Sequence, residues 1–91
     1  MQLGAERRAR IRHRLDPILR QYDPDLQFVT VFVDSAREDL GVVTQLGERP
    51  LLLKFRWVEF ISNPEELLRE EVFAQLNERL GRQASERDGP H

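Results

Sequence analysis

The pattern of apolar and polar positions divides the chain into five segments of secondary structure. The first is a stretch over residues 4–22 in which apolar side chains recur at spacings of three and four, at Ile11, Leu15, Ile18, Leu19 and Tyr22. This spacing predicts an α-helix with one apolar side. Pro17 lies inside it, and because a proline ring clashes with the carbonyl four residues back, we expect a kink or a break there.

Three strands are predicted to follow, at residues 26–34, 40–46 and 51–61. The first is rich in β-branched and aromatic residues, and neither of its faces is properly polar. A polar turn at 35–39 and a hairpin loop at 47–50 separate the strands. In the third strand Leu51, Leu53, Phe55 and Trp57 alternate with Lys54 and Arg56, so the apolar set is predicted to face the core.

A second helix is predicted to begin after Asn63. Asn63 is a good N-cap residue, Pro64 suits the first helical position, and Glu66 stands where a capping-box side chain reaches back. Gly81 is a plausible left-handed stop for this helix. Its apolar stripe is formed by Leu68, Val72, Phe73, Leu76 and Leu80.

These segments predict a small α+β domain with the order α-β-β-β-α. The short links favour a three-stranded antiparallel meander, with the two helices packed on one face. We expect residues 1–81 to form this single domain. Residues 82–91 lack apolar periodicity and contain Asp88-Gly89-Pro90, so they are predicted to be a disordered tail.

Two helices cover only one side of such a sheet, which leaves an apolar face open. A surface of this kind is usually completed by another chain. The sequence therefore predicts a protein-binding face, and a homodimer is the expected solution. The residues predicted to form the face are Val29, Val31, Val33, Lys54, Arg56 and Val58.

Charge is distributed unevenly between the first helix and the rest of the chain. Residues 1–20 hold six arginines and two acids, whereas the remaining residues hold eight basic and fourteen acidic side chains. Arg7, Arg10 and Arg14 fall on one flank of the predicted helix and are candidate anion-binding residues. Alternatively, this flank is solvated or faces acids of the same fold or of a dimer mate. The candidate acids are Glu66, Glu70, Glu71 and Glu78.

The remaining composition argues against catalysis and against bound cofactors. There is no cysteine, which suits a reducing compartment, and cytoplasm is the expected location. No apolar run is long enough to cross a membrane. His13 lies among arginines that would repel a metal cation, and no glycine-rich phosphate loop exists. We therefore expect no enzyme activity, no cofactor, no metal and no small-molecule substrate.

The function that these patterns favour is that of a non-enzymatic interaction module. It would act as an adaptor, assembly factor or inhibitor, binding a protein partner through the apolar sheet face. The alternative is a nucleic-acid-binding accessory protein that uses the Arg-rich helix. The order of elements resembles that of double-stranded-RNA-binding domains, but the second helix opens with Glu65 and Glu66 in place of phosphate-binding lysines.

Overall fold

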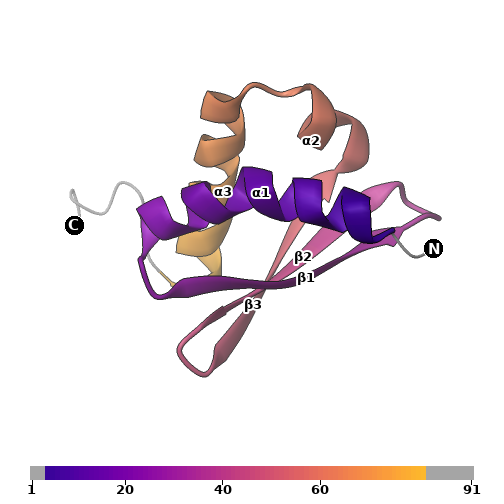
Figure 1. Ribbon diagram of the computed structural model, residues 1–91. Coiled ribbons are helices and arrows are strands. Elements are labelled where there is room, and N and C mark those ends of the chain that lie inside the picture. The colour runs from indigo at the N-terminus through magenta and orange to yellow at the C-terminus, as the bar shows by residue number, and fades with distance from the viewer. Residues whose placement is uncertain (1–3, 82–91) are drawn as a thin grey trace.

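The computed structural model describes residues 4–81, and the predicted disordered tail at 82–91 lies outside them. The chain forms helix α1 (Ala5–Tyr22), strands β1 (Leu26–Asp34), β2 (Asp39–Leu46) and β3 (Arg49–Arg56), and helices α2 (Trp57–Ser62) and α3 (Glu65–Arg79). The strands form one antiparallel meander in the order β1-β2-β3. The predicted α+β class and its α-β-β-β-α order are confirmed, with α2 as an additional short helix (Figure 1).

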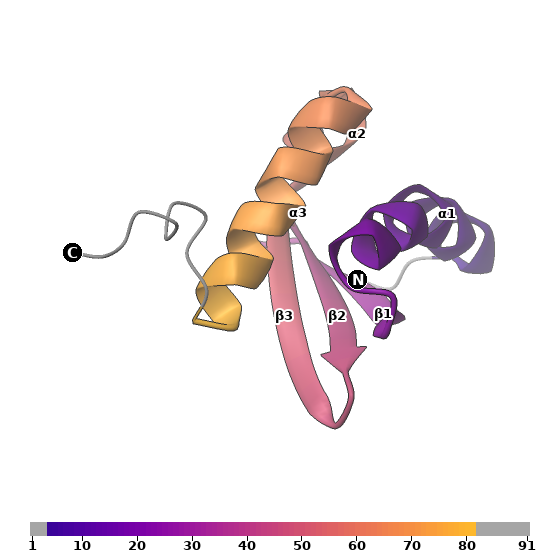
Figure 2. The same cartoon turned by 90° about the vertical axis from the view of Figure 1, so that its left-hand side faces the viewer.

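The core lies between the sheet and the two long helices. Helix α1 lies beside β1 and α3 lies beside β3 (Figure 2). Apolar side chains from one face of the sheet meet the apolar stripes of both helices. The fully buried members of this core are Leu15, Ile18, Leu19, Leu26, Leu40, Val42, Leu53, Leu68, Val72 and Leu76.

Contacts between α1 and α3 close the core at one end. The Tyr22 hydroxyl donates a hydrogen bond of 2.7 Å to Oδ1 of Asn77, and the Tyr22 ring meets the Phe73 ring edge-on at a centroid distance of 5.2 Å. The one buried polar side chain among the described residues, Thr44, donates to the carbonyl of Leu51 across the hairpin. This hydrogen bond satisfies the buried hydroxyl.

The expected break at Pro17 does not occur. Helix α1 runs from Ala5 to Tyr22 with Pro17 inside it. Ile18 and Leu19, which follow the proline, are buried, as are Ile11 and Leu15 before it. Because both halves of the helix pack on the same core, the burial of four apolar side chains outweighs the roughly 3 kcal/mol that an internal proline costs.

The predicted third strand extends five residues too far at its C-terminal end. Strand β3 ends at Arg56, and residues 57–62 form α2 instead. In this helix Phe60 turns into the core, with its ring 5.5 Å from that of Phe55. The backbone N–H of Trp57 donates to the carbonyl of Glu38 in the β1–β2 turn, which holds the start of α2 against the sheet.

The predicted N-cap of the last helix is also wrong by one residue. Asn63 closes α2, since its backbone N–H donates to the carbonyl of Glu59. Pro64 is the N-cap of α3, and no side chain caps that helix. The link between α2 and α3 is so short that Asn63 already ends α2. It therefore does not occupy the N-cap position of α3 from which its side chain would form a capping box.

Candidate functional site

A β-bulge in β1 decides which side chains form the open face of the sheet. The pairing of β1 with β2 shifts between Phe28 and Thr30, so Val29 is an extra residue in the ladder. After the bulge, the alternation of core-facing and outward-facing side chains is the opposite of the one that the sequence predicts. Val31 is only 4% exposed and lies in the core, and Val33 packs against the same core. Placing Val31 and Val33 on the open face was therefore wrong, whereas Val29 is 50% exposed.

The other predicted face residues divide between the sheet and a helix. Lys54 and Arg56 lie on β3 with exposed side chains on the open face, as predicted. Val58 does not lie in a strand. It is an exposed residue of α2, because the chain has already left the sheet at Arg56.

The observed open face, which we call the outer face, is centred on an aromatic ring. Phe32 stands directly opposite Gly41 in the ladder, and its ring lies so close that a Cβ atom on Gly41 would be 2.4 Å from Cζ of Phe32. Phe32 still exposes 44% of its surface. Apart from Gly41, the residues of this face are exposed or half-buried, and they include Thr30, Phe32, Asp34, Asp39, Val43, Leu52, Lys54 and Arg56.

One edge of the sheet is closed by side chains of α3. The Gln75 amide accepts from the backbone N–H of Lys54 at 2.9 Å and donates to the Lys54 carbonyl at 2.6 Å. Nε of Arg79 donates to the carbonyl of Leu52 at 2.9 Å. These bonds occupy groups that would otherwise pair with a further strand. At the opposite side of the sheet, β2 is the one strand that pairs with β1 within the described part of the chain.

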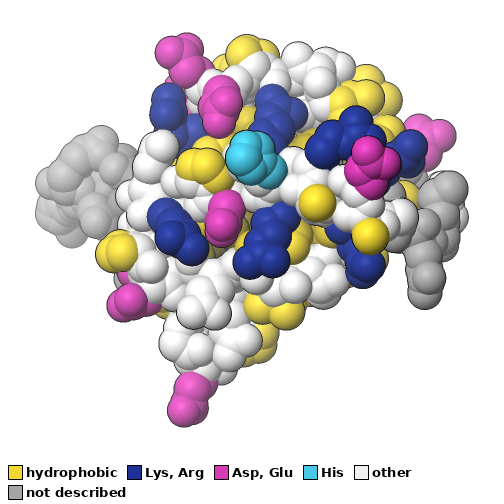
Figure 3. Space-filling model, in the orientation of Figure 1, with side chains coloured by type: hydrophobic (Ala, Val, Ile, Leu, Met, Phe, Trp, Pro, Cys, Tyr) yellow, Lys and Arg dark blue, Asp and Glu magenta, His cyan; other side chains and the backbone are white. Residues whose placement is uncertain are grey.

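The arginines of α1 are not neutralised by the acids of α3. Between residues 4 and 81 the only ion pair is Arg20 with Asp16, at 3.9 Å on the same helix. The alternative in which the basic flank faces the acids of the same fold is therefore wrong for the described residues. Basic side chains instead follow α1 along the surface (Figure 3).

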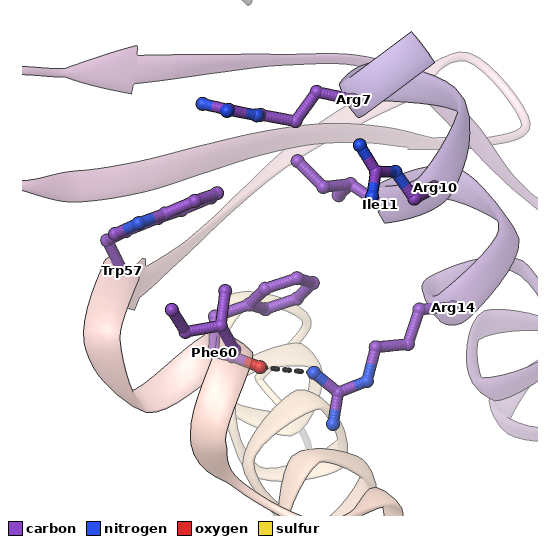
Figure 4. A pocket seen from close by; sticks show the side chains of 7 residues that line it. Arg7, Arg10, Ile11, Arg14, Trp57 and Phe60 are labelled. Atoms are coloured by element: carbon purple, nitrogen blue, oxygen red, sulfur yellow. Dashed lines mark hydrogen bonds between the residues drawn. The ribbon is translucent and has the colours of Figure 1, made fainter.

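A cleft of about 320 Å³ separates α1 from α2 and contains the three predicted anion-binding residues. Figure 4 shows Arg7, Arg10 and Arg14 extending from α1 toward the aromatic side chains of α2. The Cζ of Arg7 lies 5.9 Å from the centre of the Trp57 ring. We call this site the α1–α2 cleft, and its lining is Arg7, Arg10, Ile11, Arg14, Trp57, Phe60 and Ile61.

The three arginines of the cleft have different roles. Arg14 donates to the backbone carbonyls of Phe60 and Asn63 and lies 5.2 Å from the centre of the Phe60 ring, so it fastens α2 to α1. Arg7 and Arg10 are exposed and have no acidic partner within the described part of the chain. Arg14 therefore has a structural role, whereas Arg7 and Arg10 form no ion pair among the described residues.

The sequence did not predict that aromatic residues lie at the cleft. Trp57 and Phe60 were expected in a strand, with Trp57 facing the core. The helical turn brings both to α1, where Trp57 is half-buried. The local signal for this turn was the loss of strict alternation after Trp57, where Val58, Phe60 and Ile61 are all apolar.

The surroundings of the Glu71 carboxyl on α3 change its ionisation. Burial raises the pKa of the Glu71 carboxyl, and the nearby negative charge of Glu59 raises it further, while a hydrogen bond from Gln75 acts in the opposite direction. Over residues 4–81, no three His, Asp or Glu side chains gather into a group that could hold a metal ion. No helix in the same range is both long and apolar enough to cross a bilayer.

No protein-family model matches the chain, and neither the curated proteins nor the solved structures include a significantly similar one.

Proposed function

We propose that the protein is a non-enzymatic interaction module that binds a protein partner through the outer face, and that the partner is a second copy of the chain. The observation that carries this proposal is the Phe32 ring, which lies over Gly41 in the middle of the face and remains 44% exposed. A large aromatic ring surrounded by smaller apolar side chains is the usual centre of a binding interface.

The surroundings of Phe32 fit association better than catalysis. Val43 and Leu52 extend the apolar surface across β2 and β3, and Lys54 and Arg56 border it with charge. An apolar centre with a polar rim is the ordinary anatomy of a protein interface. Because Gln75 occupies backbone groups at the edge of β3, a partner would add a strand at the edge of β1 or pack against the outer face itself.

A two-fold dimer would place the two Phe32 rings near one axis, because the same patch is used by both copies. Substituting Phe32→Glu puts a carboxylate at that centre without changing the core. The measurement is sedimentation velocity over a range of protein concentrations, combined with circular dichroism. We expect a folded monomer for this variant and a dimer for the wild type.

Leu67→Glu is the matched control, since Leu67 is 49% exposed but lies on α3, away from the outer face. This variant should sediment like the wild type. A wild-type protein that stays monomeric at high concentration would refute the homodimer. Equal dissociation of both variants would show that the interface lies elsewhere.

A second function is favoured by a separate observation. Arg7, Arg8, Arg10 and Arg12 are exposed on α1, and none has an acidic partner among residues 4–81. A helix of this kind is able to bind the phosphates of a nucleic acid. Such binding would weaken steeply as salt increases, and it would be lost when Arg7 and Arg10 are both replaced by Gln.

A further inference from the structure

The α1–α2 cleft combines an apolar floor with two arginines, Arg7 and Arg10, that form no ion pair among residues 4–81. Ile11 and Phe60, each 4% exposed, form its base, and the half-buried Trp57 forms one wall. Arg7 and Arg10 stand at its mouth (Figure 4). The site is distinct from the outer face, since every residue that lines it belongs to α1 or α2.

The rim of the cleft carries apolar surface that the fold does not use. Ile61 lines the cleft and is 56% exposed, and Val58, one turn earlier on α2, is 61% exposed. Residues three apart lie on the same side of a helix, so the two side chains extend the cleft along α2. A ligand that covers this rim must therefore be partly apolar as well as anionic.

The volume and the charge restrict the ligand further. At about 320 Å³ the cleft is at the small end of ligand pockets, which span roughly 300–1,000 Å³. It is large enough for apolar side chains of a partner that rests mainly on the rim. Arg7 and Arg10 each present a guanidinium fork suited to a carboxylate.

Acids on the nearby helices disfavour a long polyanion. Glu59 lies on α2, close enough to Glu71 to affect its ionisation, and Glu65 and Glu66 form the first turn of α3. A nucleic acid carries a charge on every nucleotide, so one long enough to run from the cleft over α2 and α3 would approach these carboxylates. A peptide can place its carboxylates at the two arginines and apolar side chains elsewhere.

We propose that the α1–α2 cleft binds an acidic peptide segment of a partner protein. Leu, Ile or Phe side chains of the segment enter between Ile11, Trp57 and Phe60, and flanking Asp or Glu residues pair with Arg7 and Arg10. Together with the outer face, this second surface would let one molecule hold two partners.

The test begins with a random dodecapeptide library displayed on phage. It is selected against the wild type in the presence of excess soluble Arg7→Gln/Arg10→Gln double variant, which retains the structural Arg14. We expect the enriched peptides to carry Asp or Glu beside Leu, Ile or Phe. Enrichment of neutral or basic peptides, or no enrichment, would overturn the proposal.

Affinity is then measured with enriched peptides that lack tryptophan. Trp57 is the only tryptophan of the chain and lines the cleft, so its fluorescence reports occupancy directly. The double variant should bind about tenfold more weakly or worse, the loss expected when two charge-assisted contacts at an exposed site are removed.

The control removes the same charge from the same helix outside the cleft, through Arg8→Gln and Arg20→Gln. This control should retain the wild-type affinity for the peptide. A loss of affinity equal to that of the double variant would show that the effect depends only on net charge. Oligo-dT is titrated in parallel at physiological salt. Binding of oligo-dT tighter than that of every enriched peptide would assign the cleft to nucleic acid instead. Phe32→Glu should leave peptide binding intact, which separates this proposal from that for the outer face.

Discussion

The bulge at Val29 predicts an inverted order of mutational costs in β1. Val31 has a small side chain that is 4% exposed, whereas the neighbouring Phe32 has a large one that is 44% exposed. Truncating the smaller side chain should therefore cost more stability than truncating the larger one. Without the bulge, the two residues would exchange faces and the order would be reversed.

The expected magnitudes follow from burial. Val31→Ala removes two methyl groups from the core, worth about 1.6 kcal/mol in transfer free energy, and the cavity raises the cost to about 2–3 kcal/mol. Phe32→Ala loses the partial burial of the ring against Gly41, about 1 kcal/mol. For a chain of 91 residues, the total free energy of unfolding is roughly 5–14 kcal/mol. Both variants should therefore fold.

Urea unfolding followed by Trp57 fluorescence and circular dichroism measures both costs. With an m-value of about 1 kcal/mol/M, the midpoint should fall by at least about 2 M for Val31→Ala and by about 1 M for Phe32→Ala. The protein concentration is kept low, so that self-association adds nothing to the midpoint. Thr30→Ala, at an exposed neighbouring position, is the control and should change little. A larger loss for Phe32→Ala than for Val31→Ala would refute the position of the bulge.

Two further predictions concern α3. Gln75→Ala removes both hydrogen bonds to the backbone of Lys54. Because water can replace them at this exposed edge, the free energy of unfolding measured in urea should fall by only about 1 kcal/mol. An unchanged midpoint would show that the amide does not close the edge. The raised pKa of Glu71 means that its contribution to stability is present below the ordinary pKa of glutamate and is lost as pH rises through the folded-state pKa. Glu71→Gln should therefore unfold at higher urea than the wild type at neutral pH, and the two midpoints should converge in acid; a gap that is the same at both pH values would contradict the assigned cause.

Local signals in the sequence were sufficient for most of the element boundaries. β1 extends from Leu26 to Asp34 as predicted, because a dense run of β-branched and aromatic residues ends at polar turns on both sides. The stripe of Leu68, Val72 and Leu76 is buried as its four-residue spacing predicts. The positive φ of Gly47, 64°, fits the tight turn between β2 and β3 that its position indicates. Each of these features depends on neighbours along the chain.

The candidate site was only partly predictable. The sequence placed Arg7, Arg10 and Arg14 on one flank of a helix, and all three do line the cleft. Their separate roles depend on what stands opposite them. The carbonyls of Phe60 and Asn63 accept hydrogen bonds from Arg14. A helical wheel shows only the residues of α1, so it cannot reveal this contact.

Tertiary packing decided the features that local patterns left open or predicted wrongly. Alternation in β1 was read without the extra residue at Val29, because a bulge is specified by pairing with β2 and not by the strand itself. The chain after Arg56 could extend β3 or turn into a helix. The helix forms because it buries Phe60 beside Phe55 and because the Phe60 carbonyl accepts a hydrogen bond from Arg14, forty-six residues earlier in the chain. Long-range contacts of this kind leave no periodic trace in the sequence, which is why the open face and the cleft could be located only in the folded protein.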